Sequence, residues 1–121
     1  MRVARAATPA DLDTAHALPA AGSSAVPALL DELNSADWPL RSAAADILGN
    51  LGLEAREAAP ALARALADEN YWVRRNAAEA LGTLTPKDDQ STAALATALA
   101  DIDEPVRRNA ALALAKIGTA A

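Results

Sequence analysis

The residues of this sequence best suited to binding chemistry are arginines that occur in pairs. Arg74–Arg75 and Arg107–Arg108 each lie in the string Val-Arg-Arg-Asn-Ala-Ala, and the two strings are 33 residues apart. A guanidinium group carries N–H donors in a planar fork, which suits carboxylates, phosphates and aromatic faces. The pairs could therefore bind a partner, or they could hold the same structural element together twice.

Helical geometry separates the two arginines of a pair. If Val73 faces the core and each residue turns the helix by 100°, Arg74 lies at the edge of the core-facing sector. Arg75 then lies roughly 200° away, on the opposite side. We predict that the first arginine of each repeat is structural and belongs to a ladder with turn aspartates. The predicted ladder consists of Arg41, Asp68, Arg74, Asp101 and Arg107.

The sector around the second arginine predicts a surface that could bind another protein. Tryptophan beside arginine is common among residues that dominate binding energy at protein interfaces. Asn76 and Thr83 share this sector. The alternative is a solvated face in which Arg75 and Glu79 form an ordinary i,i+4 ion pair. The predicted partner-binding residues are Trp72, Arg75, Glu79, Arg108, Leu112 and Lys116.

Other residue types form no catalytic or metal-binding pattern. The chain has one histidine, His16, and no cysteine, and its five glycines form no phosphate-binding loop. Asp88–Asp89 and Asp103–Glu104 are adjacent carboxylates, which diverge by 100° on a helix and make poor acid–base pairs. We therefore expect no enzyme, no metal and no cofactor.

Composition and charge narrow the class of protein further. The net charge of −5 and the pI of about 4.7 argue against nucleic-acid binding. No run approaches the 18 or so apolar residues of a membrane span, and no apolar run of signal-peptide length follows the first arginines. Without cysteine there is no disulfide framework. We expect a soluble, cytoplasmic protein that does not bind membranes.

The elements that must position these residues repeat with a period of 33 residues. The units are "VPALLDELNSADWPLRSAAADILGNLG" from Val26, "APALARALADENYWVRRNAAEALGTLT" from Ala59 and "TAALATALADIDEPVRRNAALALAKIG" from Thr92. Alanine favours helix, and apolar residues at i, i+4 spacing predict one buried stripe on each helix. The columns expected in the core are Leu29/Leu62/Leu95, Leu33/Leu66/Leu99, Leu40/Val73/Val106, Leu48/Leu81/Leu114 and Leu51/Leu84/Ile117.

Polar and glycine residues mark the expected ends of the helices. The second helix of each unit is expected to begin after an N-cap residue: Asp37, Asn70 or Asp103. Gly52 and Gly118 are expected to end it, and Thr85–Pro86 replaces glycine in the middle unit.

Each unit is therefore a helical hairpin that must stack on its neighbours to bury its apolar faces. We predict an all-α fold, an α-α superhelix. Its expected parts are an N-terminal capping helix and loop at 1–24, and repeats at 25–53, 54–86 and 87–121.

The repeated pattern, "PALxxAL" followed by an aspartate and "VRRNAAxAL", resembles the HEAT repeat. It is most similar to the short bacterial form named after phycobilisome lyases, which designed repeat proteins also imitate. The resemblance covers 25–118; Pro27 and Pro60 match the pattern, whereas Ala93 departs from it.

The resemblance implies ion pairs that join the hairpin turn to the second helix. In this sequence they fall on Asp68 with Arg74 and on Asp101 with Arg107, while Ser35 faces Arg41 in the first unit. Helical-repeat hydroxylases related by fold need His-Glu metal motifs, which this sequence lacks.

The favoured hypothesis is a non-catalytic scaffold whose second helices present a surface to another protein. The alternatives are a bilin lyase subunit or chromophore-handling chaperone, a nucleic-acid-binding repeat and a designed scaffold. Ala111, Leu114 and Ala115 leave an apolar surface at the C-terminal end. Further repeats, self-association or a partner could cover it, or it could simply tolerate water.

Overall fold

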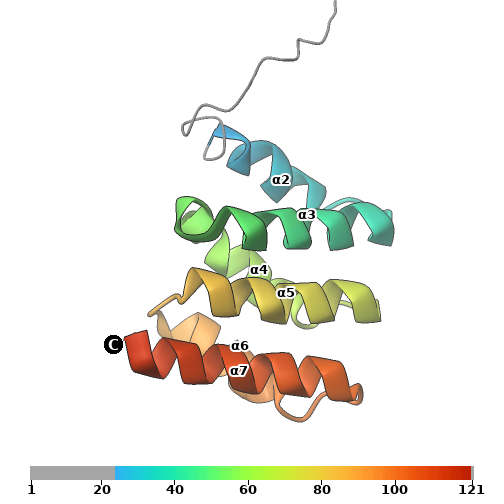
Figure 1. Cartoon of the computed structure of the whole chain (residues 1–121). Coiled ribbons are helices and arrows are strands. Elements are labelled where there is room, and N and C mark those ends of the chain that lie inside the picture. The colour runs from blue at the N-terminus through green and yellow to red at the C-terminus, as the bar shows by residue number, and fades with distance from the viewer. Residues whose placement is uncertain (1–23, 121) are drawn as a thin grey trace, which may run out of the picture.

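The computed structural model describes residues 24–120 (Figure 1). The expected capping helix and its His16 lie outside the described residues. Six α-helices and one 3-10 helix make up this part of the chain. Their bounds are α2 (Val26–Glu32), α3 (Trp38–Leu51), η1 (Gly52–Ala58), α4 (Ala59–Ala65), α5 (Tyr71–Leu84), α6 (Asp89–Ala98) and α7 (Glu104–Ala120).

The helices pair into three successive hairpins, α2–α3, α4–α5 and α6–α7. Figure 1 shows α3, α5 and α7 stacked side by side, with α4 and α6 behind them. Each second helix packs mainly on the second helix of the next hairpin, and α4 also packs on α6. The all-α superhelix predicted from the sequence is confirmed.

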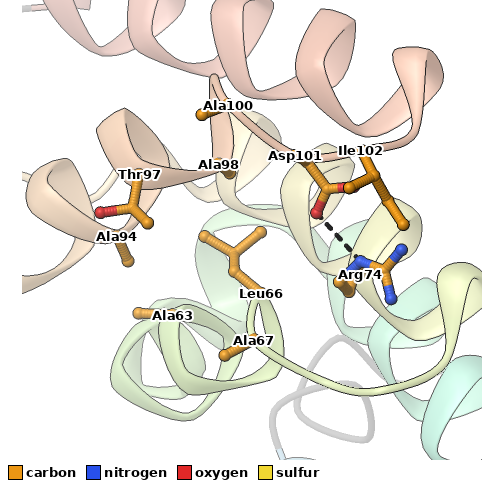
Figure 2. A pocket seen from close by; sticks show the side chains of 10 residues that line it. All are labelled: Ala63, Leu66, Ala67, Arg74, Ala94, Thr97, Ala98, Ala100, Asp101 and Ile102. Atoms are coloured by element: carbon orange, nitrogen blue, oxygen red, sulfur yellow. Dashed lines mark hydrogen bonds and ion pairs between the residues drawn. The ribbon is translucent and has the colours of Figure 1, made fainter.

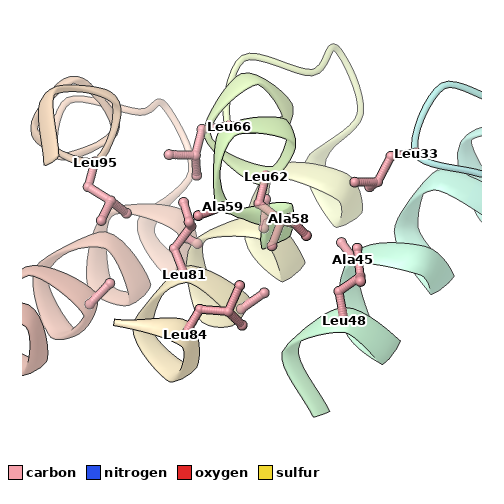
Figure 3. Close-up of a cluster of buried hydrophobic side chains, with 14 of the residues drawn as sticks. Leu33, Ala45, Leu48, Ala58, Ala59, Leu62, Leu66, Leu81, Leu84 and Leu95 are labelled. Atoms are coloured by element: carbon pink, nitrogen blue, oxygen red, sulfur yellow. The ribbon is translucent and has the colours of Figure 1, made fainter. Parts of the chain in front are cut away.

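The core consists of leucines from successive hairpins, separated by alanines (Figure 3). Leu48, Leu62, Leu81, Leu84 and Leu95 are fully buried. Burial of one leucine side chain contributes about 1.5–3 kcal/mol to the free energy of unfolding. The leucine columns therefore bind each hairpin to the next.

Two glycines let the second helices approach closely. A Cβ on Gly49 would lie 3.0 Å from Cα and Cβ of Ala80, and one on Gly82 would lie 3.3 Å from the same atoms of Ala113. A side chain at either glycine would meet the alanine of the next second helix, so glycine is needed for this close approach. This pairing of glycine with alanine sets the spacing between α3, α5 and α7.

Two apolar residues that we expected in the core are exposed instead. Leu33 and Leu66 are 8% and 7% exposed, but Leu99 is 44% exposed. Leu40 is exposed as well, whereas Val73 and Val106 are fully buried. The position of Leu99 is buried where another hairpin follows, as at Leu66, and the position of Leu40 is buried where another hairpin precedes, as at Val73. Within the described part of the chain, Leu99 in the last hairpin and Leu40 in the first lack that neighbour.

The helix ends agree only partly with the expected signals. Asn70 is an N-cap, because its Oδ1 accepts hydrogen bonds from the N–H groups of Trp72 and Val73. Asp37 makes no such bond with its side chain; its own N–H donates to Ser35 Oγ.

Two of the three expected C-terminal stop signals are confirmed, at Gly52 and Thr85. Gly52 ends α3 with a φ of 64°, and Thr85 ends α5 in the left-handed region with a φ of 44°. Gly118 lies inside α7 and does not end it, which corrects the expectation. The kinked 3-10 helix η1, which joins the first hairpin to the second, was not expected from the sequence.

Candidate protein-binding surface

The exposed side of α5 carries an aromatic and cationic cluster. The guanidinium carbon of Arg75 lies 5.6 Å from the centroid of the Trp72 ring, which is the geometry of a cation–π contact. Tyr71 meets Trp72 edge-on, with ring centroids 5.0 Å apart. Trp72 remains 47% exposed, so much of its surface is open to a partner.

The second arginine of each pair, Arg75 or Arg108, forms an ion pair with a glutamate of its own helix. Arg75 Nη1 lies 3.9 Å from Glu79 Oε1, and it also donates to Asn76 Oδ1 at 3.1 Å. Arg108 Nη2 donates to Glu104 Oε1 at 2.7 Å. These pairs are exposed, so each stabilises the fold by only a few tenths of a kcal/mol, roughly 0.2–1. A partner could displace them at little cost.

Shallow hollows between neighbouring second helices bring the remaining predicted residues together. Glu79, Leu112 and Lys116 line a hollow of about 100 Å³ between α5 and α7. A smaller one, of about 40 Å³, lies between α3 and α5 and includes Asp46 and Glu79. Leu112 is 53% exposed beside the basic end of this surface. We call Trp72, Arg75, Glu79, Arg108, Leu112 and Lys116 the second-helix surface.

Asn76 does not belong to this surface, although helical geometry placed it there. Its Nδ2 donates to the backbone oxygen and to Oγ of Ser42 on α3, at 3.1 and 2.9 Å. Asn109 donates in the same way to the backbone oxygen of Arg75, at 3.3 Å. Both asparagines therefore join a second helix to the one before it.

The guanidinium groups of Arg41 and Arg74, the first arginine of each pair, link consecutive hairpins and also join the two parts of their own hairpin. Arg41 on α3 binds Asp68 in the next turn through Nε and Nη2, at 2.8 and 3.1 Å. Its Nη1 donates to the backbone oxygens of Ser35 and Ala36 in its own turn.

Arg74 repeats this arrangement one hairpin later. Its Nε binds Asp101 at 2.9 Å, its Nη2 binds Asp103 at 2.6 Å, and its Nη1 donates to the backbone oxygens of Asp68 and Glu69. The expected carboxylate pairs, Asp68 with Arg74 and Asp101 with Arg107, are therefore wrong: each carboxylate binds the arginine of the preceding hairpin. Asp103, which we expected only as an N-cap residue, also joins the ladder, because its carboxylate binds Arg74.

The arginine ladder lowers the pKa of the Asp68 carboxyl. Burial alone would raise the pKa of the Asp68 carboxyl, but hydrogen bonds from Arg41 and from the N–H of Asn70 outweigh burial and lower it. The hydrogen bond to Asp68 likewise raises the pKa of Arg41. Both groups are charged at neutral pH and hold the hairpins together as an ion pair.

A groove between the first helices was not predicted from the sequence. It has a volume of about 510 Å³ and lies between α4 and α6, with the Arg74–Asp101 pair at one end (Figure 2). Ile102, in the last turn, is 88% exposed at its edge. The only signal in the sequence was Ile102 itself, where the earlier turns carry Ala36 and Glu69.

Two further observations concern the described part of the chain alone. Within residues 24–120, no three His, Cys, Asp or Glu side chains gather as metal ligands do. None of the helices in this range has the length and apolarity of a membrane span.

The stacked hairpins and their arginine ladder define an α-solenoid built from short helical repeats. The chain belongs to the HEAT-repeat family, since the family profile for HEAT repeats matches residues 26–115. It is also similar to the solved structure of human deoxyhypusine hydroxylase in complex with glycerol, with a TM-score of 0.66 and 35% identity. That match covers 78% of this chain and 32% of the hydroxylase chain, so this chain spans about a third of its length. The comparison with curated proteins found no match.

Proposed function

We propose that the protein is a non-catalytic scaffold of the cytoplasm that binds another protein through its second-helix surface. The observation that carries the proposal is Trp72, which stays half-exposed under a cation–π contact with Arg75 instead of packing into the core. Tryptophan and arginine in such positions often dominate the energy of protein interfaces. Leu112 and Lys116 would extend the contact onto α7.

The pattern of agreement between repeats supports this choice of surface. Core and ladder positions keep their residue types, as in Leu48/Leu81/Leu114 and Arg41/Arg74/Arg107. The surface positions differ, as in Ser42/Arg75/Arg108 and Asp46/Glu79/Leu112. Packing explains the first group, whereas recognition of a particular partner would explain the second.

The non-catalytic part of the proposal rests on residue types. The chain has a single histidine and no cysteine, and its adjacent carboxylates diverge on their helices. The enzyme in the structural comparison is about three times as long as the matched region, so its activity is not carried over.

The finer resemblance, to the short repeats named after phycobilisome lyases, supports a second candidate, the handling of a bilin. The half-exposed Trp72 could stack on such a chromophore. The chain has only three aromatic residues in total, two Trp and one Tyr, which is few for an aromatic cleft. A change in visible absorbance on mixing with bilin would favour this candidate over the scaffold.

The scaffold proposal is tested by affinity capture from a lysate of the source cells, followed by mass spectrometry. The double variant Trp72→Ala/Arg108→Ala should lose a partner that the wild type captures, while its helix content by circular dichroism stays unchanged. We expect at least a tenfold loss, because two interface anchors are each worth about 1–2 kcal/mol.

Trp38→Ala is the matched control. Trp38 is 44% exposed, close to the value for Trp72, but lies outside the second-helix surface. This variant should capture the partner as well as the wild type does. Equal capture by all three proteins, or loss of helix content in the double variant, would contradict the proposed role of Trp72.

A further inference from the structure

The outer side of the last hairpin keeps the residue types of a buried interface. We call this side, made of Ala96, Leu99, Arg107, Ala111, Leu114 and Ala115, the end face. In the earlier hairpins, the positions equivalent to Ala111 and Leu114 are buried: Ala45, Leu48, Ala78 and Leu81 are all 0% exposed. Ala111 is exposed and Leu114 only partly buried, because no further hairpin packs on them within the described residues.

Arg107 adds a polar signal to this apolar surface. Arg41 and Arg74 each bind a carboxylate of the following hairpin, in addition to backbone oxygens of their own turn. Arg107 makes the backbone contact, from Nη1 to Asp101 O at 2.7 Å. Within residues 24–120, no carboxylate forms an ion pair with it. Its Nε and Nη2 are the atoms that in Arg41 and Arg74 bind aspartate.

We propose that the end face binds a helical hairpin that carries an aspartate in its turn, in the same register as the stack within this chain. The aspartate would occupy the place that Asp68 has for Arg41 and Asp101 has for Arg74. The inference is independent of the second-helix surface, which lies on another side of the same helices. The partner of the end face would be an α-helical hairpin with a carboxylate at its turn.

A second copy of this chain fits the end face less well than such a hairpin. Stacked head to tail, it would present its first hairpin, which has Ser35 where the later turns have Asp68 and Asp101. It has Ala43 where the later hairpins have the bridging Asn76 and Asn109. The only ladder carboxylate that it would offer is Asp37, at the position of Asp103.

The spacing of the helices specifies one more residue of the partner. Ala115 occupies the position of Gly49 and Gly82, which face Ala80 and Ala113. A Cβ at Gly49 would meet Ala80 at 3.0 Å. We therefore expect the partner to have glycine, not alanine, opposite Ala115.

The experiment uses the full chain and a labelled peptide with the sequence of residues 88–118, in which Ala113 is changed to glycine. This peptide contains Asp101, Asp103 and Asn109, the groups that the third hairpin uses against the second. Fluorescence anisotropy measures its binding. A second form joins the peptide to the C-terminus through a flexible Gly-Ser linker of about 10 residues, which raises its effective concentration to the millimolar range.

We expect the peptide to bind and the change Arg107→Gln to weaken binding about tenfold, the effect of losing one or two hydrogen bonds to a charged group. The same loss should follow from Asp101→Asn with Asp103→Asn in the peptide, and the two losses should not add. Arg108→Gln is the matched control and should bind normally, since Arg108 pairs with Glu104 on its own helix.

Three outcomes would overturn the proposal. The first is no binding of the free peptide together with no protection of α7 from hydrogen exchange in the tethered form. The second is binding that is indifferent to both Arg107→Gln and the peptide changes. The third is a wild-type dimer in sedimentation that Arg107→Gln dissociates, because a second copy would then occupy the end face.

Discussion

The arginine ladder explains why one residue recurs in every repeat. Arg41 donates to carbonyl oxygens of its own turn and to the carboxylate of Asp68 in the next turn. One planar guanidinium group therefore closes a hairpin and attaches the following one. Lysine has a compact charge without the fork, so it could not make both sets of bonds in this geometry.

The ladder predicts a specific dependence of stability on pH. The pKa of Asp68 is lowered in the folded protein, so its contribution is fully present above the unfolded value, about 3.9, and is lost as the pH falls through the folded value. Asp68→Asn should therefore lower the free energy of unfolding at pH 7, and the difference from the wild type should shrink below about pH 4. Urea denaturation followed by circular dichroism at several pH values measures this difference.

Asp31→Asn is the control for this prediction. Asp31 is exposed on α2, so its replacement should change the free energy of unfolding little at any of these pH values. A difference between the wild type and Asp68→Asn that persists unchanged at pH 3 would show that charge on Asp68 is not the cause.

At the scale of elements, the second helices form the rigid part of the molecule. Gly49 and Gly82 allow α3, α5 and α7 to approach until backbone meets backbone, and Asn76 and Asn109 tie each helix to the preceding one. The second-helix surface is thus mounted on closely packed helices. A partner would meet it with little loss of conformational entropy.

Glycine substitutions should have opposite effects at two positions. In Gly49→Ala the new Cβ meets the backbone of Ala80 at 3.0 Å, so α3 and α5 must separate. We expect a loss of about 1–3 kcal/mol in the free energy of unfolding, as in other overpacked cores.

Gly118→Ala provides the comparison. Nothing lies within 4 Å of the added Cβ, and the residue is inside α7, so the better helix propensity of alanine should stabilise the protein by up to about 1 kcal/mol. Thermal unfolding of both variants measures the two effects. Destabilisation by Gly118→Ala, or no effect of Gly49→Ala, would contradict the packing described for these helices.

At the scale of the whole molecule, stability is a sum of hairpins and the interfaces between them. The middle hairpin has an interface on each side, since α5 packs on both α3 and α7. The last hairpin has one interface and an open end face within the described residues.

This arrangement predicts a gradient of hydrogen exchange. Amides of α5 should exchange slowest, and those of α6 and α7 faster, because the last hairpin can open without breaking a second interface. Exchange followed by mass spectrometry measures the protection of each helix. Equal protection of α5 and α7 would show that the described part of the chain opens only as a whole.

The sequence by itself determined the all-α fold, the period of the hairpins and most of their apolar columns. These follow from residue type and spacing, which act locally: Leu62 and Leu95 are buried as their positions predict. The exposed positions of Trp72 and Leu112 also followed from helical geometry alone.

Tertiary structure decided which residues meet across hairpins. An alignment of repeats shows that Arg74 and Asp68 recur, but every copy of Asp68 could face the arginine of its own hairpin or of the preceding one. In the folded protein Asp68 and Asp101 bind the arginine of the preceding hairpin, because stacking places each turn beside that arginine. Leu99 has the same residue type as the buried Leu66 and is exposed because burial depends on a neighbour, which the sequence of one repeat does not contain.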